Sequence, residues 1–181
     1  VPLFATFLVR QNASLVSKIS PVIARIFTPL VTLTLAIFLV TIVYSGKDPY
    51  NDREFLLVFN GVLIGVMALI LFSLGEATRQ NASRLHQYFL LALAVLAIVD
   101  NGIALSAISF RLVEYGVTPN RLAVLGSNAL VMVHLMITTQ KLWSFLKGNE
   151  RIEAVEKSLT SYLPFYAVWA AVVSFVFPVL F

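Results

Sequence analysis

Most polar side chains that could carry out chemistry lie inside two long apolar runs of this sequence. A carboxyl, an imidazole and several amides or hydroxyls interrupt segments that are otherwise aliphatic or aromatic. Polar and ionisable groups are costly inside a membrane and commonly mark proton, ion or substrate paths. The candidate intramembrane polar cluster comprises Asp100, Asn101, Ser127, Asn128, His134 and Thr138.

The two ionisable members of this cluster are expected near the middle of the bilayer, on adjacent helices. At 1.5 Å per residue, Asp100 lies about 16 Å from Arg111, at the end of its apolar run. His134 lies about 20 Å from Arg121 on the next run, so the two depths differ by about one turn. A hydrogen bond from Asp100 to Asn128, Ser127 or His134 is therefore compatible with the spacing.

Two interpretations of the cluster remain open. On the second run, one helical face carries a stripe that becomes more polar towards Lys141: Val124, Ser127, Val131, His134, Thr138 and Lys141. A polar stripe that meets a mid-membrane acid suits a proton or ion path, or a pocket for a polar headgroup or substrate. The favoured alternative is a buried hydrogen-bond cluster that holds the bundle together, with bonds worth about 0.6 kcal/mol each.

The segment between these runs predicts an outer hairpin formed by Glu114, Tyr115, Gly116, Thr118 and Arg121, with Val117, Pro119 and Asn120. Gly116 can adopt a positive φ, and Pro119 can begin a helix that Thr118 caps. Glu114 can pair with Arg121 or Arg111. A structural turn is the favoured interpretation, and a surface site for a headgroup or a partner is the functional one.

The sequence contains no signature of a nucleotide-binding loop, hydrolase elbow, zinc protease or kinase. It has no cysteine, and its two histidines, His86 and His134, lie on different segments. No metal site, catalytic residue or cofactor is therefore predicted. The net charge of +4 is modest and reports membrane topology before nucleic-acid binding, so no nucleic-acid partner is expected.

The composition predicts an all-α integral membrane helical bundle. Hydrophobic residues make up 59% of the 181 residues and charged residues 12%, with mean hydropathy +0.89, whereas soluble domains have about 45–50% and about 25%. A spanning helix needs about 20 apolar residues. Five spans are predicted, at about 26–44, 55–74, 88–110, 122–146 and 162–181.

Three local patterns refine this bundle. Gly61 and Gly65 lie one turn apart on the second span, a spacing that permits close helix packing. Residues 1–25 are predicted to be a basic amphipathic segment on the membrane surface or the end of a cut helix, and 26–181 the transmembrane bundle. Residues 147–161 are predicted to form a short surface helix, and Tyr162, Tyr166 and Trp169 an interfacial aromatic belt.

The positions of the basic residues predict the orientation. Lys and Arg number three in the N-terminal segment, two after the second span and four from Lys141 onwards, against four on the opposite side. The positive-inside rule therefore places the N-terminus in the cytoplasm and the C-terminus outside. The expected location is the inner (cytoplasmic) membrane of a bacterium, as a multi-pass protein.

The hairpin sequence Glu114-Tyr115-Gly116-Val117-Thr118-Pro119-Asn120-Arg121 resembles a loop of the form E-Y-G-x-T-x-x-R between two spans of uncharacterised bacterial polytopic membrane proteins. The resemblance covers about fifteen residues with their flanks. It implies a bacterial cytoplasmic-membrane location and no settled activity, and it transfers no catalytic residue. Those proteins are generally longer, which would fit a chain cut at Val1.

These observations predict a non-enzymatic integral membrane subunit that anchors, assembles or senses within a membrane complex. Its expected partners are the lipid bilayer and other membrane subunits or further copies of itself. The alternative is a transporter or channel component with Asp100 and His134 in a proton, ion or polar-substrate path. A membrane enzyme acting on lipid-linked substrates at the hairpin ranks third because no catalytic pair is visible.

Overall fold

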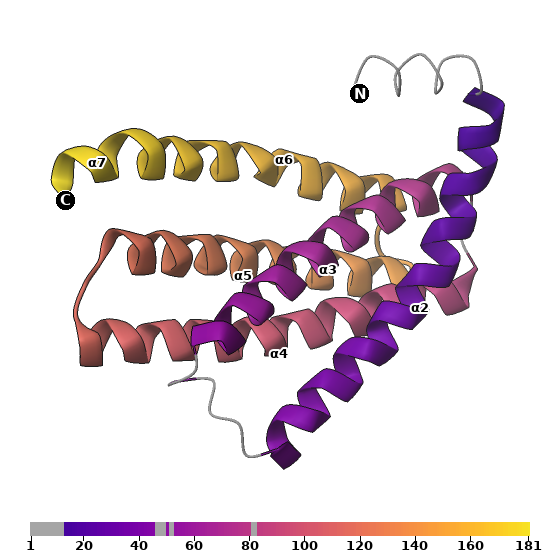
Figure 1. Cartoon of the computed structure of the whole chain (residues 1–181). Helices are drawn as coiled ribbons and strands as arrows, with labels where there is room; N and C mark the ends of the chain where they lie inside the picture. Colours follow the sequence, from indigo (N-terminus) through magenta and orange to yellow (C-terminus); the bar gives the residue numbers. More distant parts are fainter. Residues whose placement is uncertain (1–12, 46–49, 51–52, 81–82) are drawn as a thin grey trace.

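The computed structural model consists of long helices that follow the apolar runs of the sequence (Figure 1). It describes residues 13–45, 50, 53–80 and 83–181, with the backbone alone at 13–21, 43, 45, 53–57, 76–80 and 152. In these residues there is no strand, and the helical elements are α2 (Ala13–Ser45), α3 (Arg53–Gln80), α4 (Arg84–Tyr115), α5 (Pro119–Leu146), α6 (Ile152–Ala171), a π-helical turn η1 (Val172–Val176) and α7 (Phe177–Leu180).

Within the described residues, five helical segments are long and apolar enough to cross a membrane. They are Val22–Ile42, Val58–Gly75, Arg84–Tyr115, Pro119–Leu146 and Glu153–Leu180. The predicted all-α class is confirmed for the described residues, and so is the number of helices long and apolar enough to span a membrane. The chain therefore has the build of a multi-pass membrane protein.

Helix α4 is the central helix of the bundle. It packs against α2, α3 and α5, whereas α6 packs against α5 and α3. Successive helices α4, α5 and α6 lie side by side and run in alternating directions, while α2 and α3 cross them obliquely (Figure 1). The polar positions on α4 and α5 therefore lie between helices.

Small residues explain how α4 packs so closely against three neighbours. Its buried face carries Ala94, Ala97, Ala104 and Ala107, all with almost no exposed surface. In a membrane, small side chains let helix backbones approach one another and gain van der Waals contact. The two apolar core clusters, one around Leu93 and Ala97 and one around Ala104, lie along this face.

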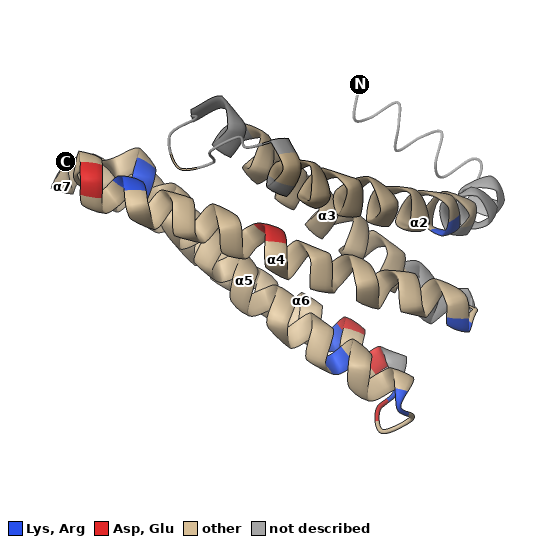
Figure 2. Ribbon diagram, turned by 90° about the horizontal axis from the view of Figure 1, so that it is seen from below, with Lys and Arg blue, Asp and Glu red and all other residues tan. Residues whose placement is uncertain are grey.

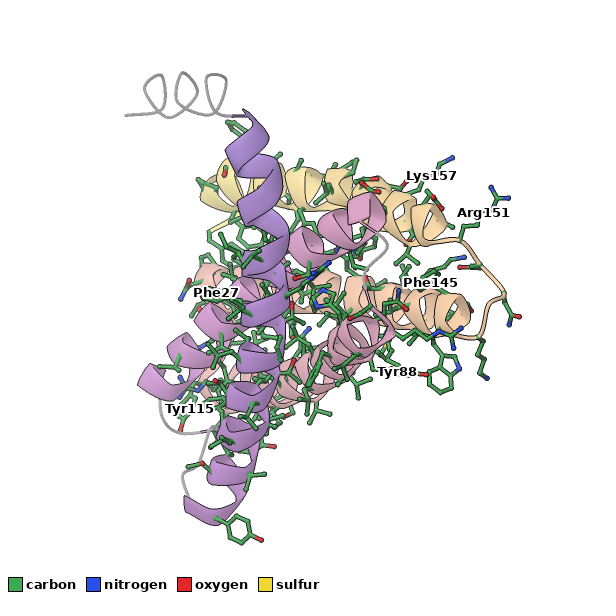
Figure 3. The ribbon with its side chains drawn as sticks, turned by 90° about the vertical axis from the view of Figure 1, so that its right-hand side faces the viewer. Phe27, Tyr88, Tyr115, Phe145, Arg151 and Lys157 are labelled. Carbon is green, nitrogen blue, oxygen red and sulfur yellow. The ribbon has the colours of Figure 1, made fainter. Side chains whose placement is uncertain are left out.

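Charged residues gather towards the ends of α4, α5 and α6, and the middle of the bundle is almost free of them (Figure 2). At the start of α6, Arg151 and Lys157 point away from the bundle (Figure 3). This distribution is what insertion into a hydrocarbon layer about 30 Å thick requires.

Two predicted helix boundaries are wrong. Residues 147–161 do not form a separate surface helix, because α6 begins at Ile152 and continues into the fifth span. Likewise, residues 13–25 are continuous with the first span in α2, and residues 1–12 lie outside the described part. In both places the helix continues through polar and charged residues, which are compatible with a helix that extends beyond the apolar layer.

The predicted helix contact at Gly61 and Gly65 does not occur among the described residues. Both glycines are exposed, and a Cβ added to either would have nothing within 4 Å. The α2–α3 contact instead uses larger side chains on both sides of this face, such as Phe38 and Phe59, whose ring centroids are 5.2 Å apart. The described residues therefore leave the two glycines open to a further packing partner.

Candidate functional site

The predicted polar cluster lies in the middle of the bundle. Asp100 is the seventeenth of the 32 residues of α4, and His134 the sixteenth of the 28 residues of α5. Both side chains have no exposed surface, and those of Asn101, Asn128 and Thr138 are also buried. The structure nevertheless divides these residues into three groups with different environments.

The first group is an amide chain that joins three helices. Asn101 Nδ2 on α4 donates to the backbone oxygen of Asn128 on α5 at 2.9 Å. Asn128 Nδ2 in turn donates to Asn60 Oδ1 on α3 at 2.8 Å. These bonds tie α3, α4 and α5 together at one depth, which is the structural role predicted for Asn101 and Asn128.

The second group connects α5 to α6 through His134. Its Nδ1 lies 3.1 Å from the hydroxyl of Tyr166, and its ring stacks on Tyr162 with centroids 4.5 Å apart. Tyr166 is the fourteenth residue of the 28-residue span Glu153–Leu180. The prediction that Tyr166 belongs to an interfacial belt is therefore wrong, because its hydroxyl finds a polar partner inside the bundle.

A tryptophan makes a second contact between α5 and α6. Trp169 Nε1 donates to Ser127 Oγ at 3.1 Å and to the Ala123 carbonyl at 3.3 Å. The indole lies over Gly126, where an added Cβ would overlap its six-membered ring. Gly126 was not predicted as a site residue, although a small residue directly before Ser127 and Asn128 is a usable signal of close packing.

The polar stripe predicted on α5 is the face that meets α6. Thr138 donates to the backbone oxygen of His134 at 2.8 Å, and Lys141 pairs with Glu150 at 2.7 Å, just before α6 begins. This face meets α6 through His134 and Ser127, which contact Tyr166 and Trp169, whereas the Thr138 hydroxyl bonds within α5.

Asp100 forms the third group by itself, because it makes no contact of this kind. Among the described residues, neither of its carboxyl oxygens has a hydrogen-bond partner. The contemplated bonds to Asn128, Ser127 and His134 do not form, because each of those residues faces a partner on another helix. Two other buried polar atoms of the cluster, Asn101 Oδ1 and His134 Nε2, also lack a partner among the described residues.

The hairpin between α4 and α5 is a well-defined turn, as predicted. Gly116 has φ +81°, Pro119 begins α5, and Thr118 Oγ1 accepts from the backbone N–H of Arg121 at 3.3 Å. Arg121 Nη1 donates to the carbonyls of Tyr115 and Gly116 at 2.8 and 2.7 Å. The guanidinium also lies 5.7 Å from the Tyr115 ring centroid.

The expected ion pair of Glu114 is absent from the described residues. Arg121 binds backbone carbonyls instead, and Arg111 Nε donates to the Tyr50 carbonyl at 2.8 Å. Tyr50 also stacks edge-on against Phe110, with ring centroids 5.6 Å apart. Glu114 is exposed, so water already solvates its charge, and an ion pair there would stabilise the fold only slightly.

We expect Thr118→Ala to loosen the start of α5. Loss of an N-cap hydroxyl costs about 1 kcal/mol, which corresponds to about a fivefold increase in local opening. Limited trypsin digestion after Arg121 in detergent should accelerate by that factor. Thr34→Ala is the matched control, because the exposed Thr34 hydroxyl only donates to its own helix, at the Leu30 carbonyl. Equal cleavage in both variants would show that the cap has no role.

The described residues contain no group of three or more His, Asp or Glu side chains able to hold a metal ion. Fold and site together have the features of a multi-pass helical membrane protein in which several buried polar residues join helices, and the Asp100 carboxyl has no partner among the described residues. No family model, curated protein or solved structure matches this chain.

Proposed function

We propose that this chain is a non-enzymatic integral membrane subunit that assembles with further transmembrane helices through the α2–α3 face. The observation that carries the proposal is the open position of Gly61 and Gly65. A glycine in a helix interior destabilises it by about 0.5–1 kcal/mol relative to alanine. Two glycines one turn apart, without a neighbour among the described residues, are suited to the close approach of another helix.

The shape of this face supports the proposal. A groove of about 650 Å³ lies between α2 and α3, and Gly65 forms part of its wall. Its other lining residues are almost all apolar and come from both helices: Phe27, Leu30, Val31, Thr34, Leu35, Phe38, Val58, Val62, Val66, Leu69 and Phe72. Such a groove offers a packing surface to a helix and no recognition groups for a polar ligand.

The proposed setting is the inner membrane of a bacterium, with the N-terminus in the cytoplasm and the C-terminus outside. The excess of Lys and Arg on the N-terminal side supports this orientation. An impermeant thiol reagent should therefore label a cysteine at Glu114 in intact cells and spare one at Gly148, since the native chain has no cysteine. The reverse labelling pattern would overturn the orientation.

Photo-crosslinking in native membranes tests the assembly function. A photoreactive residue at Ile64, which is 70% exposed between the two glycines, should give a discrete protein adduct. The same residue at Val179, which is 84% exposed near the C-terminus, serves as the matched site and should react mainly with lipid. The double change Gly61→Leu and Gly65→Leu should remove most of the Ile64 adduct. Lipid adducts alone at both sites would refute the assembly function.

A transporter or channel component is the second candidate, favoured by the unpartnered carboxyl of Asp100. His134 no longer supports it directly, because its Nδ1 contacts Tyr166 at the α5–α6 contact. In vesicles with an internal pH dye, Asp100→Asn should abolish proton flux while the Ile64 adduct persists. If the native protein shows no proton flux and Asp100→Asn loses the Ile64 adduct, the two results favour assembly alone.

A further inference from the structure

The carboxyl group of Asp100 is fully enclosed within the bundle and contributes no bond between helices. Its side chain has no exposed surface, and neither oxygen accepts or donates a hydrogen bond among the described residues. Ala97 and Ala104 lie one turn away on either side, each within an apolar core cluster. A carboxylate in such surroundings would have lost its water without gaining a replacement.

The facing helices offer no charge that could neutralise a carboxylate. Positions 26–43 of α2 and 58–75 of α3 contain no Asp, Glu, Lys, Arg or His, and position 44 is Tyr. On α5, positions 122–140 contain His134 alone, whose Nδ1 contacts Tyr166. On α4 itself, Asp100 is the one charged residue from 87 to 110. An ionised Asp100 would therefore be a buried, unpaired charge, which strongly destabilises a folded structure.

A metal ion fits these surroundings poorly. Hard cations such as Ca²⁺ and Mg²⁺ take about six or more oxygen ligands. Besides the two carboxyl oxygens, Asn101 Oδ1 is the one unpartnered buried oxygen on the same stretch of α4. A proton needs a single oxygen, and one carboxyl group supplies it.

We propose that Asp100 is a proton-binding site in the middle of the membrane, occupied in this packed state of the bundle. The neutral acid removes the charge without any rearrangement of α2, α3 or α5. Release of the proton then requires water or a cationic partner to reach the carboxyl. This binding does not rest on the assembly function, because it involves residues of one chain.

Infrared spectroscopy of the full chain in lipid vesicles tests the proposal by observing the proton carrier itself. At neutral pH, the native-minus-Asp100→Asn difference should contain the carbonyl stretch of a protonated carboxylic acid. The side chain of Glu114 is exposed at the hairpin. The native-minus-Glu114→Gln difference is therefore the matched control and should lack the protonated-acid band.

A second measurement does not depend on how the Asp100 variant folds. Asp100 is one of three aspartates, the others being Asp48 and Asp52. In a chain with Asp48→Asn and Asp52→Asn, aspartate labelled with ¹³C at its carboxyl carbon marks Asp100 alone. The protonated band should then shift on labelling. A shifted carboxylate band in its place would overturn the proposal, and so would loss of the protonated band on addition of sodium or potassium at constant pH.

Discussion

Asp100→Ala is expected to make the folded bundle more stable, whereas Asn101→Ala, one residue further, should make it less stable. An aspartate in the middle of a membrane costs about 2.5–3.5 kcal/mol on insertion scales, and no described residue offsets this with a hydrogen bond. Alanine removes that cost and leaves a small void worth about 1 kcal/mol. The net stabilisation is therefore about 1.5–2.5 kcal/mol.

The neighbouring substitution has the opposite sign because Asn101 has a partner. Its Nδ2 donates to the Asn128 backbone oxygen at 2.9 Å, and hydrogen bonds of this kind are worth about 0.6 and at most about 1.7 kcal/mol in membrane bundles. Asn101→Ala removes this side-chain bond between α4 and α5. A loss of about 1 kcal/mol is expected.

Thermal unfolding in detergent, followed by the fluorescence of Trp143 and Trp169, measures both changes. Asp100→Asn is the near-isosteric control, since it removes the ionisable group and keeps the volume. If Asp100→Ala lowered Tm as much as Asn101→Ala, Asp100 would have a stabilising partner and would be a structural residue. A rise in Tm would mean that the native chain retains a destabilising carboxyl, as functional sites commonly do.

The sequence was sufficient to predict the helices that are long and apolar enough to cross a membrane, because each depends on a local run of apolar residues. The same holds for the hairpin, where Gly116, Thr118 and Pro119 act on their own backbone. The orientation, the membrane and the function remain predictions, since they depend on contacts with the cell.

The partners of the polar residues were not predictable from the sequence. His134 contacts Tyr166 and Asn128 binds Asn60 because of how each helix is rotated about its axis. Hydropathy does not report that rotation when apolar residues occur on every face of a helix, as they do between positions 58 and 75 of α3. Depth alone suggested an Asp100–His134 pair, whereas rotation turns His134 towards α6.

Gly126→Ala is expected to detach the indole of Trp169 from α5. The added Cβ would overlap the ring, and moving the ring breaks its bonds to Ser127 Oγ and the Ala123 carbonyl. Overpacking of this kind costs about 1–3 kcal/mol, more than the roughly 0.5–1 kcal/mol that alanine gains over glycine in a helix. A net loss of about 1–2 kcal/mol should result.

In a Trp143→Phe background, Trp169 is the only tryptophan, so its emission reports the displacement directly. The matched control is Gly102→Ala on α4, where the added Cβ would meet Met132 Cε at an ordinary 3.8 Å. That variant should keep the emission and gain stability, because alanine favours the helix. An unchanged emission in Gly126→Ala would mean that the indole does not lie over α5.

A double-mutant cycle with Trp169→Leu separates the clash from any other effect of alanine at position 126. Without the indole, the methyl group has no ring to displace, so Gly126→Ala should become neutral or slightly stabilising. The coupling energy should be about 1–3 kcal/mol, as found for residues in direct contact. The α5–α6 contact would then depend on a glycine that accommodates a tryptophan, in addition to the His134–Tyr166 bond. If Gly126→Ala is equally destabilising with leucine at position 169, the clash is not the cause.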